Sequence, residues 1–527
     1  MTSVFYNGVV CAERDSAACG IKMLKAGGNA VDAAVAAAIG ESLCAPADNG
    51  FGGYGGSMII YVPSEKKIHT VDYNTRAPKN ITQTFYTDAH SLRNVPDDKR
   101  AEIEKYTETG WSLVGVPGTI KGLHHALNQW GTKSWKEVSE PAIDLIRNGL
   151  TINDTLSNLL NNNQEIIRRH KKISSILFPE GRIPQLGEKL LLPAFTEFAE
   201  SLCRNTPDDF YNGAAASIIT GYIQANNGIL SSADFSDYRV QSKEPITVSF
   251  LEHDIFSVPP AAGGISVLQA LILFEEYDKL KKINETEFIS ALYEIYDIIW
   301  KDRLKKAGDP TDSRTVTSGL LDRANARDAL NKQKKQSHDL FRDNTPGTIH
   351  LSTCDKNGMM VALTQTKGGG FPHSINFIPE LGLFLNHGLV LFDPVPDRPN
   401  SIAPGKQPLN NMSPVIIMKD QKPVYTLGAP GARKIISAVS QIILNLLVRG
   451  MKVDQAVNAP RMHYEAGNEI YLEENAPVKW QETLKSTGKK LLKIPAVGGP
   501  AHAIKFSSGE ITGGTDYRLG GGKVAGY

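Results

Sequence analysis

A threonine that follows a Pro-Gly turn constrains this chain more than any other feature. Residues 346–358 read Pro-Gly-Thr-Ile-His-Leu-Ser-Thr-Cys-Asp-Lys-Asn-Gly, which is a turn, a strand-like run and a second turn. A threonine hydroxyl inside a chain is a poor nucleophile. If the bond before Thr348 is cut, the freed amine, whose unperturbed pKa is about 7.7–8.0, can serve as the base for that hydroxyl. Considered alone, Thr348 is more simply an ordinary strand residue after a turn.

Several further motifs occur along the chain in a recognisable order. They are Gly-Gly-Asn-Ala-Val-Asp-Ala-Ala at 27–34, Asn-Gly-Phe-Gly-Gly-Tyr-Gly-Gly at 49–56, Pro-Pro-Ala-Ala-Gly-Gly at 259–264, Pro-Leu-Asn-Asn-Met-Ser-Pro at 408–414, Gly-Ala-Pro-Gly-Ala at 428–432, Asn-Ala-Pro-Arg-Met-His at 458–463 and Ala-Gly-Tyr at 525–527. Together with the segment at Thr348, this ordered set resembles the gamma-glutamyltranspeptidase family. The resemblance runs from about residue 8 to residue 527.

The periodicity of the chain predicts an α/β protein. Strand-like segments at 8–13, 57–62, 67–73, 349–354, 359–366 and 415–418 are separated by helical blocks at 15–43, 139–225 and 264–307. Asp15 and Ser16 are candidate N-caps of the first block. Such an alternation favours two sheets sandwiched by helices. Residues 310–347 are polar and are interpreted as an exposed linker.

The resemblance adds a specific architecture and a maturation step. It implies the four-layer αββα sandwich of N-terminal-nucleophile hydrolases. It also implies a precursor that cuts itself between Gly347 and Thr348, into a large subunit (1–347) and a small subunit (348–527). We expect these two products to remain together as a heterodimer that forms one structural domain. Gly347 suits the attack because it has no side chain and tolerates strained backbone angles, and Pro346 fixes the local chain direction.

The resemblance also assigns the catalytic groups. The mature Thr348 would attack an amide and form an acyl-enzyme, which passes the acyl group to water or to an amine. Gly431 and Ala432 match the positions whose backbone N–H groups stabilise the oxyanion. Thr366 matches a second threonine that holds the nucleophile's hydroxyl. Without the resemblance, Gly431 lies in a turn before a helix at 434–448, and Thr366 is a strand-end threonine.

The substrate pocket departs from the family pattern. The family's Tyr-Arg-x-x-Ala-Pro motif reads Tyr-Asn-Thr-Arg-Ala-Pro at 73–78, so Asn74 replaces the arginine and Arg76 follows two residues later. In a strand, two residues keep the same face, so Arg76 is predicted to contact a substrate carboxylate. A surface arginine is the alternative interpretation. Asn410 and Asn411 replace a Ser-Ser pair.

The segment that corresponds to the family's binding site for the substrate α-amine also departs from the family pattern. In residues 385–391, Gly388 and Leu391 stand where the family has acidic residues, and the loop at 392–408 is shorter than the family's lid. An α-ammonium buried without a carboxylate costs several kcal/mol. We therefore expect a small acid-amide such as oxamate to be bound by Asn74, Arg76, Asn410 and Asn411. Two alternatives stay open: a gamma-glutamyltransferase that accepts compounds such as glutathione through a rearranged pocket, and an unprocessed, inactive binding or structural protein.

Composition excludes several partner classes. The chain has 527 residues, 41% hydrophobic and 21% charged, with a net charge of +1, which gives no reason to expect nucleic acid or an acidic membrane surface as partners. Neither a signal sequence nor a membrane-spanning run is recognised. The five cysteines fit no metal or redox spacing, so we expect reduced thiols and a cytoplasmic location. No metal or organic cofactor is implied, because the nucleophile, base and oxyanion donors are all protein groups.

Overall fold

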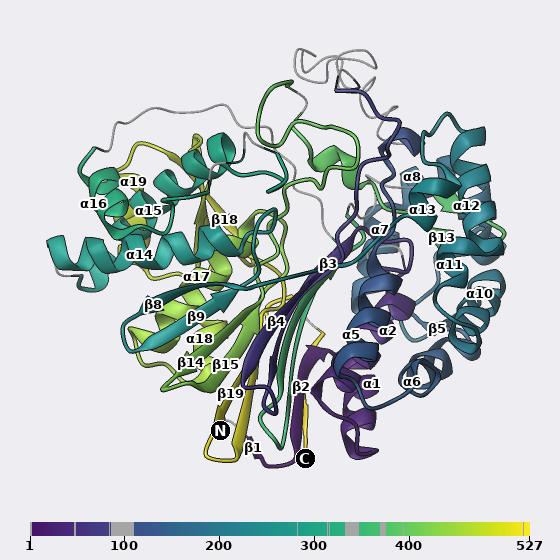
Figure 1. Cartoon of the computed structure of the whole chain (residues 1–527), viewed down its shortest axis with the longest axis horizontal. Helices are drawn as coiled ribbons and strands as arrows, with labels where there is room; N and C mark the ends of the chain where they lie inside the picture. The colour runs from purple at the N-terminus through teal and green to yellow at the C-terminus, as the bar shows by residue number, and fades with distance from the viewer. Residues whose placement is uncertain are drawn as a thin grey trace.

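Two antiparallel β-sheets lie face to face between two layers of helices (Figure 1). The structure is a computed structural model, and it describes residues 3–46, 49–83, 85, 110–281, 283–312, 315, 317–332, 347–368, 376–393, 395–519 and 521–527.

The first sheet contains the strand that begins with Thr348. Its order is β21 (Gly522–Gly526), β2 (Gly8–Glu13), β10 (Thr348–Asp355), β11 (Met360–Thr366), β3 (Gly55–Val62), β4 (Lys67–Asp72) and β7 (Gln241–Lys243). All neighbours are antiparallel, and the register pairs Thr348 with Thr366. A central strand therefore begins at the predicted nucleophile, opposite the second predicted threonine.

The second sheet is also antiparallel. Its order is β1 (Val4–Phe5), β20 (Glu510–Thr515), β19 (His502–Ser507), β15 (Lys422–Gly428), β14 (Val415–Lys419), β9 (His253–Ser257) and β8 (Ile246–Phe250). In both sheets, strands that precede the Gly347–Thr348 bond pair with strands that follow it. Apolar side chains such as Val9, Ile59, Ile416 and Ile504 fill the space between the sheets.

A helical layer covers the outer face of each sheet (Figure 1). Next to the first sheet lie α1 (Arg14–Lys25), α2 (Ala30–Cys44), α5 (Thr119–Trp130) and α6 (Trp135–Arg147). Next to the second lie α14 (Gly264–Lys281), α15 (Glu285–Lys306), α16 (Arg323–Asn331), α17 (Lys434–Leu447), α18 (Val453–Asn458) and α19 (Val478–Lys485). The predicted four-layer αββα sandwich is confirmed.

The remaining elements decorate this sandwich. They are the helices α7 (Asp154–Asn162), α8 (Gln164–Arg169), α9 (Lys171–Leu177), α10 (Pro193–Arg204), α11 (Asp209–Asn212), α12 (Ala214–Ala225) and α13 (Ser232–Ser236), the strand pairs β5 (Leu150–Thr151) with β6 (Lys189–Leu190) and β12 (Phe377–Ile378) with β13 (Leu383–Phe384), the small sheet of β16 (Met462–Tyr464), β17 (Glu469–Glu473) and β18 (Lys490–Ile494), and the 3-10 turns Trp111–Leu113, Pro179–Gly181 and Gly388–Leu391. The helical content predicted at 139–225 is confirmed, apart from the β5–β6 pair.

The small residues of α2 let it pack closely on the first sheet. The whole helix is buried, and Asn29 caps it by accepting hydrogen bonds from the backbone N–H groups of Val31 and Asp32. Thr353 Oγ1 on β10 donates to the carbonyl oxygen of Ala30 at 2.7 Å. These contacts fix the strand that begins with Thr348 against a rigid layer.

Two sequence predictions about local structure are wrong. Neither Asp15 nor Ser16 caps the first helix, because α1 already begins at Arg14 and the hydroxyl of Ser16 donates to buried Glu41 instead. The predicted exposed linker contains α16, which Asp322 caps and which buries Ala326. Within the predicted linker, residues 313, 314, 316 and 333–346, which include Pro346, lie outside the described residues.

Candidate active site

The side chains of Thr348 and Thr366 meet at the paired ends of β10 and β11. Thr348 Oγ1 donates to Thr366 Oγ1 at 3.3 Å, and Thr366 Oγ1 donates to the carbonyl oxygen of Gly347 at 2.9 Å. The backbone N–H of Gly368 donates to Thr366 Oγ1 at 3.0 Å, which fixes that hydroxyl. Antiparallel pairing brings these two threonines together, since they are directly opposite in the register.

The carbonyl oxygen of Gly347 is therefore held by more than one donor. Besides the Thr366 hydroxyl, the backbone N–H of Lys367 donates to it at 3.4 Å. Gly347 has a φ of +108°, a conformation that glycine adopts without the penalty that other residues incur. The carbonyl group that the Thr348 hydroxyl would attack is that of Gly347, and its oxygen already accepts these hydrogen bonds.

Gly431 and Ala432 form a tight turn between β15 and α17. Their φ values are +125° and +52°, and the N–H of Lys434 closes the turn on the carbonyl oxygen of Gly431. Among the described residues, no acceptor is bonded to the backbone N–H of either residue. Ala432 lines the same pocket as Thr348. Gly431 is not among the described lining residues, so only Ala432 is placed in the pocket with the hydroxyl, and the oxyanion role of the two N–H groups stays a prediction.

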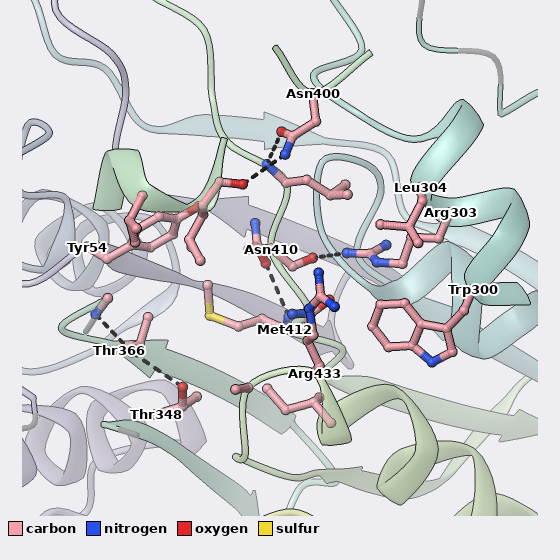
Figure 2. Close-up of a pocket in the computed structure, with 17 residues that line it drawn as sticks. Tyr54, Trp300, Arg303, Leu304, Thr348, Thr366, Asn400, Asn410, Met412 and Arg433 are labelled. Carbon is pink, nitrogen blue, oxygen red and sulfur yellow. Dashed lines mark hydrogen bonds between the residues drawn. The ribbon is translucent and has the colours of Figure 1, made fainter. Parts of the chain in front are cut away.

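A pocket of about 100 Å³ opens in front of Thr348 (Figure 2). Its described lining residues are Tyr54, Trp300, Arg303, Leu304, Thr348, Thr366, Gly368, Val390, Leu391, Asn400, Leu409, Asn410, Asn411, Met412, Ala432, Arg433 and Ile435. Two guanidinium groups belong to this set, and none of its described members is acidic. The walls are otherwise apolar or carry neutral amide and hydroxyl groups.

Arg303 comes from α15 and is only 2% exposed. Its Nη1 donates to Ser266 Oγ at 3.3 Å, and its Nη2 donates to the carbonyl oxygen of Asn410. Burial, and then the charge of neighbouring Arg433, lowers the pKa of Arg303 to about 9. The guanidinium is still charged at neutral pH, and it raises the positive potential of the pocket.

Arg433 directly follows the Gly431–Ala432 turn. Its Nη1 donates to Glu465 Oε2 at 2.7 Å, and its guanidinium carbon lies 5.4 Å from the centre of the Trp300 ring. Burial acts to raise the pKa of Glu465, but the hydrogen bond from His463 and the charge of Arg433 hold it at about 2. Glu465 is therefore ionised, and it does not line the pocket.

Asn410 and Asn411, which the sequence predicts to bind substrate, both line the pocket with Thr348. Asn410 is nearly buried; its side-chain oxygen accepts from the N–H of Met412 at 3.2 Å, and its own N–H donates to Ala261 at 3.0 Å. These bonds fix the turn that presents both amide side chains.

Asn74 and Arg76 are not among the described residues that line this pocket. Asn74 is buried and donates to Ser57 Oγ and Asp72 Oδ1. Arg76 Nη1 donates to the carbonyl oxygen of Gly405 at 3.2 Å and lies 3.9 Å from Asp309 Oδ2. The sequence argument assumed a strand at this point, but β4 ends at Asp72, so alternation of faces does not extend to Arg76.

Leu391 occupies the pocket wall where the family pattern predicts an acidic residue. It lies at the end of the 3-10 turn Gly388–Leu391, next to Val390, which also lines the pocket. Asn386 holds this turn in place, because its side-chain oxygen accepts from the N–H groups of Gly115 and Gly388, each at 3.0 Å. An apolar wall therefore replaces a carboxylate at this position.

The sequence of this chain matches the family model for gamma-glutamyltranspeptidase over residues 16–526. The chain belongs to this family. It is an N-terminal-nucleophile hydrolase of the type that matures by cutting itself and then works as an amidohydrolase or acyltransferase. The alternative of an inactive binding protein is not favoured.

Named relatives cover nearly the whole chain. The chain is 31% identical over 518 residues to the acylase ACY 1 proenzyme of Pseudomonas sp. (strain SE83), covering 97% of this chain and 92% of that one. It is 30% identical over 531 residues to the glutathione hydrolase proenzyme of Escherichia coli (strain K12), covering 96% and 90%. The fold is similar to the crystal structure of cephalosporin acylase from Bacillus halodurans, with a TM-score of 0.89, 23% identity and coverage of 100% and 97%.

The structure also bears on the expectations about thiols, metal binding and membrane crossing. All five cysteines are free and buried, as predicted for reduced thiols. Within the described ranges, no three His, Cys, Asp or Glu side chains gather into a group that could hold a metal ion. Among the described helices, none combines the length and apolar composition that a bilayer crossing requires.

Proposed function

We propose that this gamma-glutamyltranspeptidase homologue hydrolyses small amides whose acyl group carries a carboxylate but no α-ammonium group. The observation that carries the proposal is the charge of the pocket: the described residues around Thr348 include Arg303 and Arg433 and no carboxylate. Asn410 and Asn411 supply neutral amide contacts. The acyl group of oxamate has this chemistry, whereas the gamma-glutamyl group of glutathione does not.

Self-cleavage at Gly347–Thr348 creates the nucleophile. Thr348 Oγ1 attacks the carbonyl carbon of Gly347, and the oxygen that gains charge is stabilised by the Thr366 hydroxyl and the Lys367 N–H. The C–N bond breaks, the Thr348 nitrogen takes the proton that Oγ1 gives up, and an ester links Gly347 to Thr348 Oγ1. Water then hydrolyses the ester to a Gly347 carboxylate and a free Thr348. The two chains stay together because their strands pair in both sheets.

Amide hydrolysis reuses the same hydroxyl. The Thr348 amine takes the proton of its own Oγ1 as the oxygen attacks the substrate carbonyl, while the N–H groups of Gly431 and Ala432 receive the oxyanion. The leaving amine takes the proton, and the acyl group remains on Oγ1. Water, or an acceptor amine, completes the cycle.

The energetic reason for the preference is desolvation. A substrate α-ammonium would be placed near two like charges, with no carboxylate to accept from it among the described lining residues. One unpaired buried polar group costs about 1–3 kcal/mol, which is roughly a 5- to 150-fold difference in kcat/KM. A carboxylate in the same pocket instead gains charge-assisted hydrogen bonds.

A matched pair of chromogenic substrates tests the proposal. Glutaryl p-nitroanilide and gamma-glutamyl p-nitroanilide differ only in the α-ammonium group, and oxamate and glutathione extend the comparison. The expected result is a higher kcat/KM for the glutaryl compound, with no turnover by Thr348→Ala. Faster turnover of the gamma-glutamyl compound than of every acid-amide would contradict the substrate class, though not the family.

Cleavage and location have their own measurements. Purified protein should resolve on a denaturing gel into two chains, with a new N-terminus at Thr348, whereas Thr348→Ala should remain one chain. We also propose a cytoplasmic location, on the basis of the five free thiols. Cell fractionation that places most of the protein in an exported fraction would contradict it.

A further inference from the structure

The two guanidinium groups of the pocket are bonded differently. Arg303 is 2% exposed, and both of its terminal nitrogens donate to protein acceptors, Ser266 Oγ and the carbonyl oxygen of Asn410. The Arg433 side chain is 14% exposed, and among the described residues only its Nη1 has an acceptor, Glu465. Arg433 therefore keeps N–H groups for a ligand, whereas Arg303 acts mainly as a fixed positive charge.

A chain of hydrogen bonds fixes the orientation of Arg433. His463 Nε2 lies 2.7 Å from Glu465 Oε1, and His463 Nδ1 lies 2.8 Å from Ser437 Oγ. Burial keeps His463 neutral by lowering its pKa, and ionised Glu465 can only accept. The proton must therefore sit on Nε2, so that the Ser437 hydroxyl donates to His463, and His463 donates to Glu465. The second oxygen of Glu465 remains for Arg433.

Arg433 lies next to the predicted oxyanion turn, both in the sequence and in the pocket. Arg433 follows Ala432, whose backbone N–H is a predicted oxyanion donor, and its side chain lines the same pocket as Thr348 and Asn410 (Figure 2). An anion bound by Arg433 would therefore lie in the same pocket as the Thr348 hydroxyl. The ring of Trp300 supports the guanidinium from one side.

We propose that Arg433 is the specificity-determining residue that contacts the carboxylate of the acyl group, and that Glu465 is the positioning residue that aims it. This proposal rests on the proposed function and assigns its anion recognition to one side chain. It replaces Arg76, the residue that the sequence pattern suggested for this contact.

The first test compares two substrates in matched variants. Glutaryl p-nitroanilide and its neutral methyl ester differ only in the charge of the acyl group. Arg433→Met should lower the ratio of their kcat/KM values about 10- to 100-fold, mainly through a higher KM for the acid, because a hydrogen bond to a charged group is lost. Arg433→Lys keeps the charge but lacks the planar guanidinium, so its ratio of kcat/KM values should lie between those of the wild type and Arg433→Met. Arg449→Met, beyond the end of α17, is the control and should match the wild type.

The second test asks whether Glu465 acts through Arg433. Glu465→Gln leaves one side-chain oxygen for two donors, Arg433 and His463, so Arg433 loses its fixed orientation. The ratio of kcat/KM for the acid to that for the ester should then fall by about 3- to 10-fold. In the double variant Arg433→Met/Glu465→Gln the ratio should equal that of Arg433→Met alone. Additive losses would show that Glu465 acts independently and would overturn its positioning role.

The outcomes separate this proposal from the proposed function. If the wild-type enzyme hydrolyses the glutaryl anilide but Arg433→Met keeps the wild-type substrate ratio, the assignment of Arg433 is wrong. Should the wild-type enzyme hydrolyse neither substrate, the proposed function fails, and calorimetric binding of glutarate still tests Arg433. Binding should weaken at least about 10-fold in Arg433→Met and stay unchanged in Arg449→Met. Equal affinities in the three proteins would refute the assignment.

Discussion

Replacing Thr366 by valine should slow self-cleavage while preserving the fold. Valine has nearly the shape of threonine, but it removes the hydroxyl that donates to the Gly347 carbonyl at 2.9 Å and accepts from Thr348. The remaining donor, the Lys367 N–H, lies at 3.4 Å, beyond the usual range for a strong N–H···O bond. Loss of one oxyanion donor costs about 2.7–4 kcal/mol, so the rate should fall roughly 10²- to 10³-fold.

The assay follows the precursor over time. Freshly purified protein is incubated and sampled onto denaturing gels, and mass spectrometry identifies the new N-terminus. Thr366→Ser restores the hydroxyl and should recover most of the wild-type rate.

Thr426→Val provides the structural control. Thr426 is a fully buried threonine in β15 whose hydroxyl has no hydrogen-bond partner among the described residues, so its replacement loses no bond. The Thr426→Val precursor should therefore cleave itself at the wild-type rate. A Thr366→Val precursor that matures within about threefold of the wild-type rate would refute the view that this hydroxyl stabilises the oxyanion.

Three further predictions concern the oxyanion turn, acid stability and the thiols. Gly431→Ala places a Cβ 2.5 Å from Gly498 Cα at a φ of +125°, so amide hydrolysis should be nearly abolished and the melting temperature lowered, as kinetics and calorimetry would show. Burial lowers the pKa of His502 to about 4, so the neutral imidazole stabilises the folded state above pH 6.5. As the pH falls from 6.5 towards 4, the free energy of unfolding should decrease by up to about 3 kcal/mol. Denaturant unfolding of His502→Asn should show a smaller decrease over the same pH range. Thiol titration of the denatured protein should count five free thiols, and fewer would contradict the reduced state.

The family resemblance assigns roles to Thr348, Thr366 and Gly431, and local backbone geometry accounts for where these residues lie. Thr348 and Thr366 belong to strands joined by a short turn, so their facing positions follow from the pairing of β10 with β11. Gly431 precedes a helix, and a turn of that kind leaves N–H groups unpaired. In each case a few neighbouring residues suffice to define the geometry.

The positions of the two pocket arginines depend on tertiary structure and could not be predicted from local patterns. Arg303 lies on a long helix whose pattern gives no sign that one side chain reaches the pocket. Arg433 carried a usable signal, since it directly follows the predicted oxyanion position at Ala432. Arg76 is not among the described lining residues, and β4 ends at Asp72, four residues earlier, so the strand alternation on which that prediction rested does not reach it.

The chemistry of the bond and the choice of substrate are therefore separable in this molecule. In the proposed mechanism, Thr348, Thr366 and the Gly431–Ala432 turn contact only the atoms of the reacting bond, so they do not select the acyl group. Leu391 and Arg433 line the same pocket, and in the proposed function this apolar wall and guanidinium disfavour an ammonium and favour a carboxylate. Substitutions at these two residues should therefore change which amide is hydrolysed while maturation continues, since self-cleavage takes place on the chain's own backbone and requires no acyl-group contact.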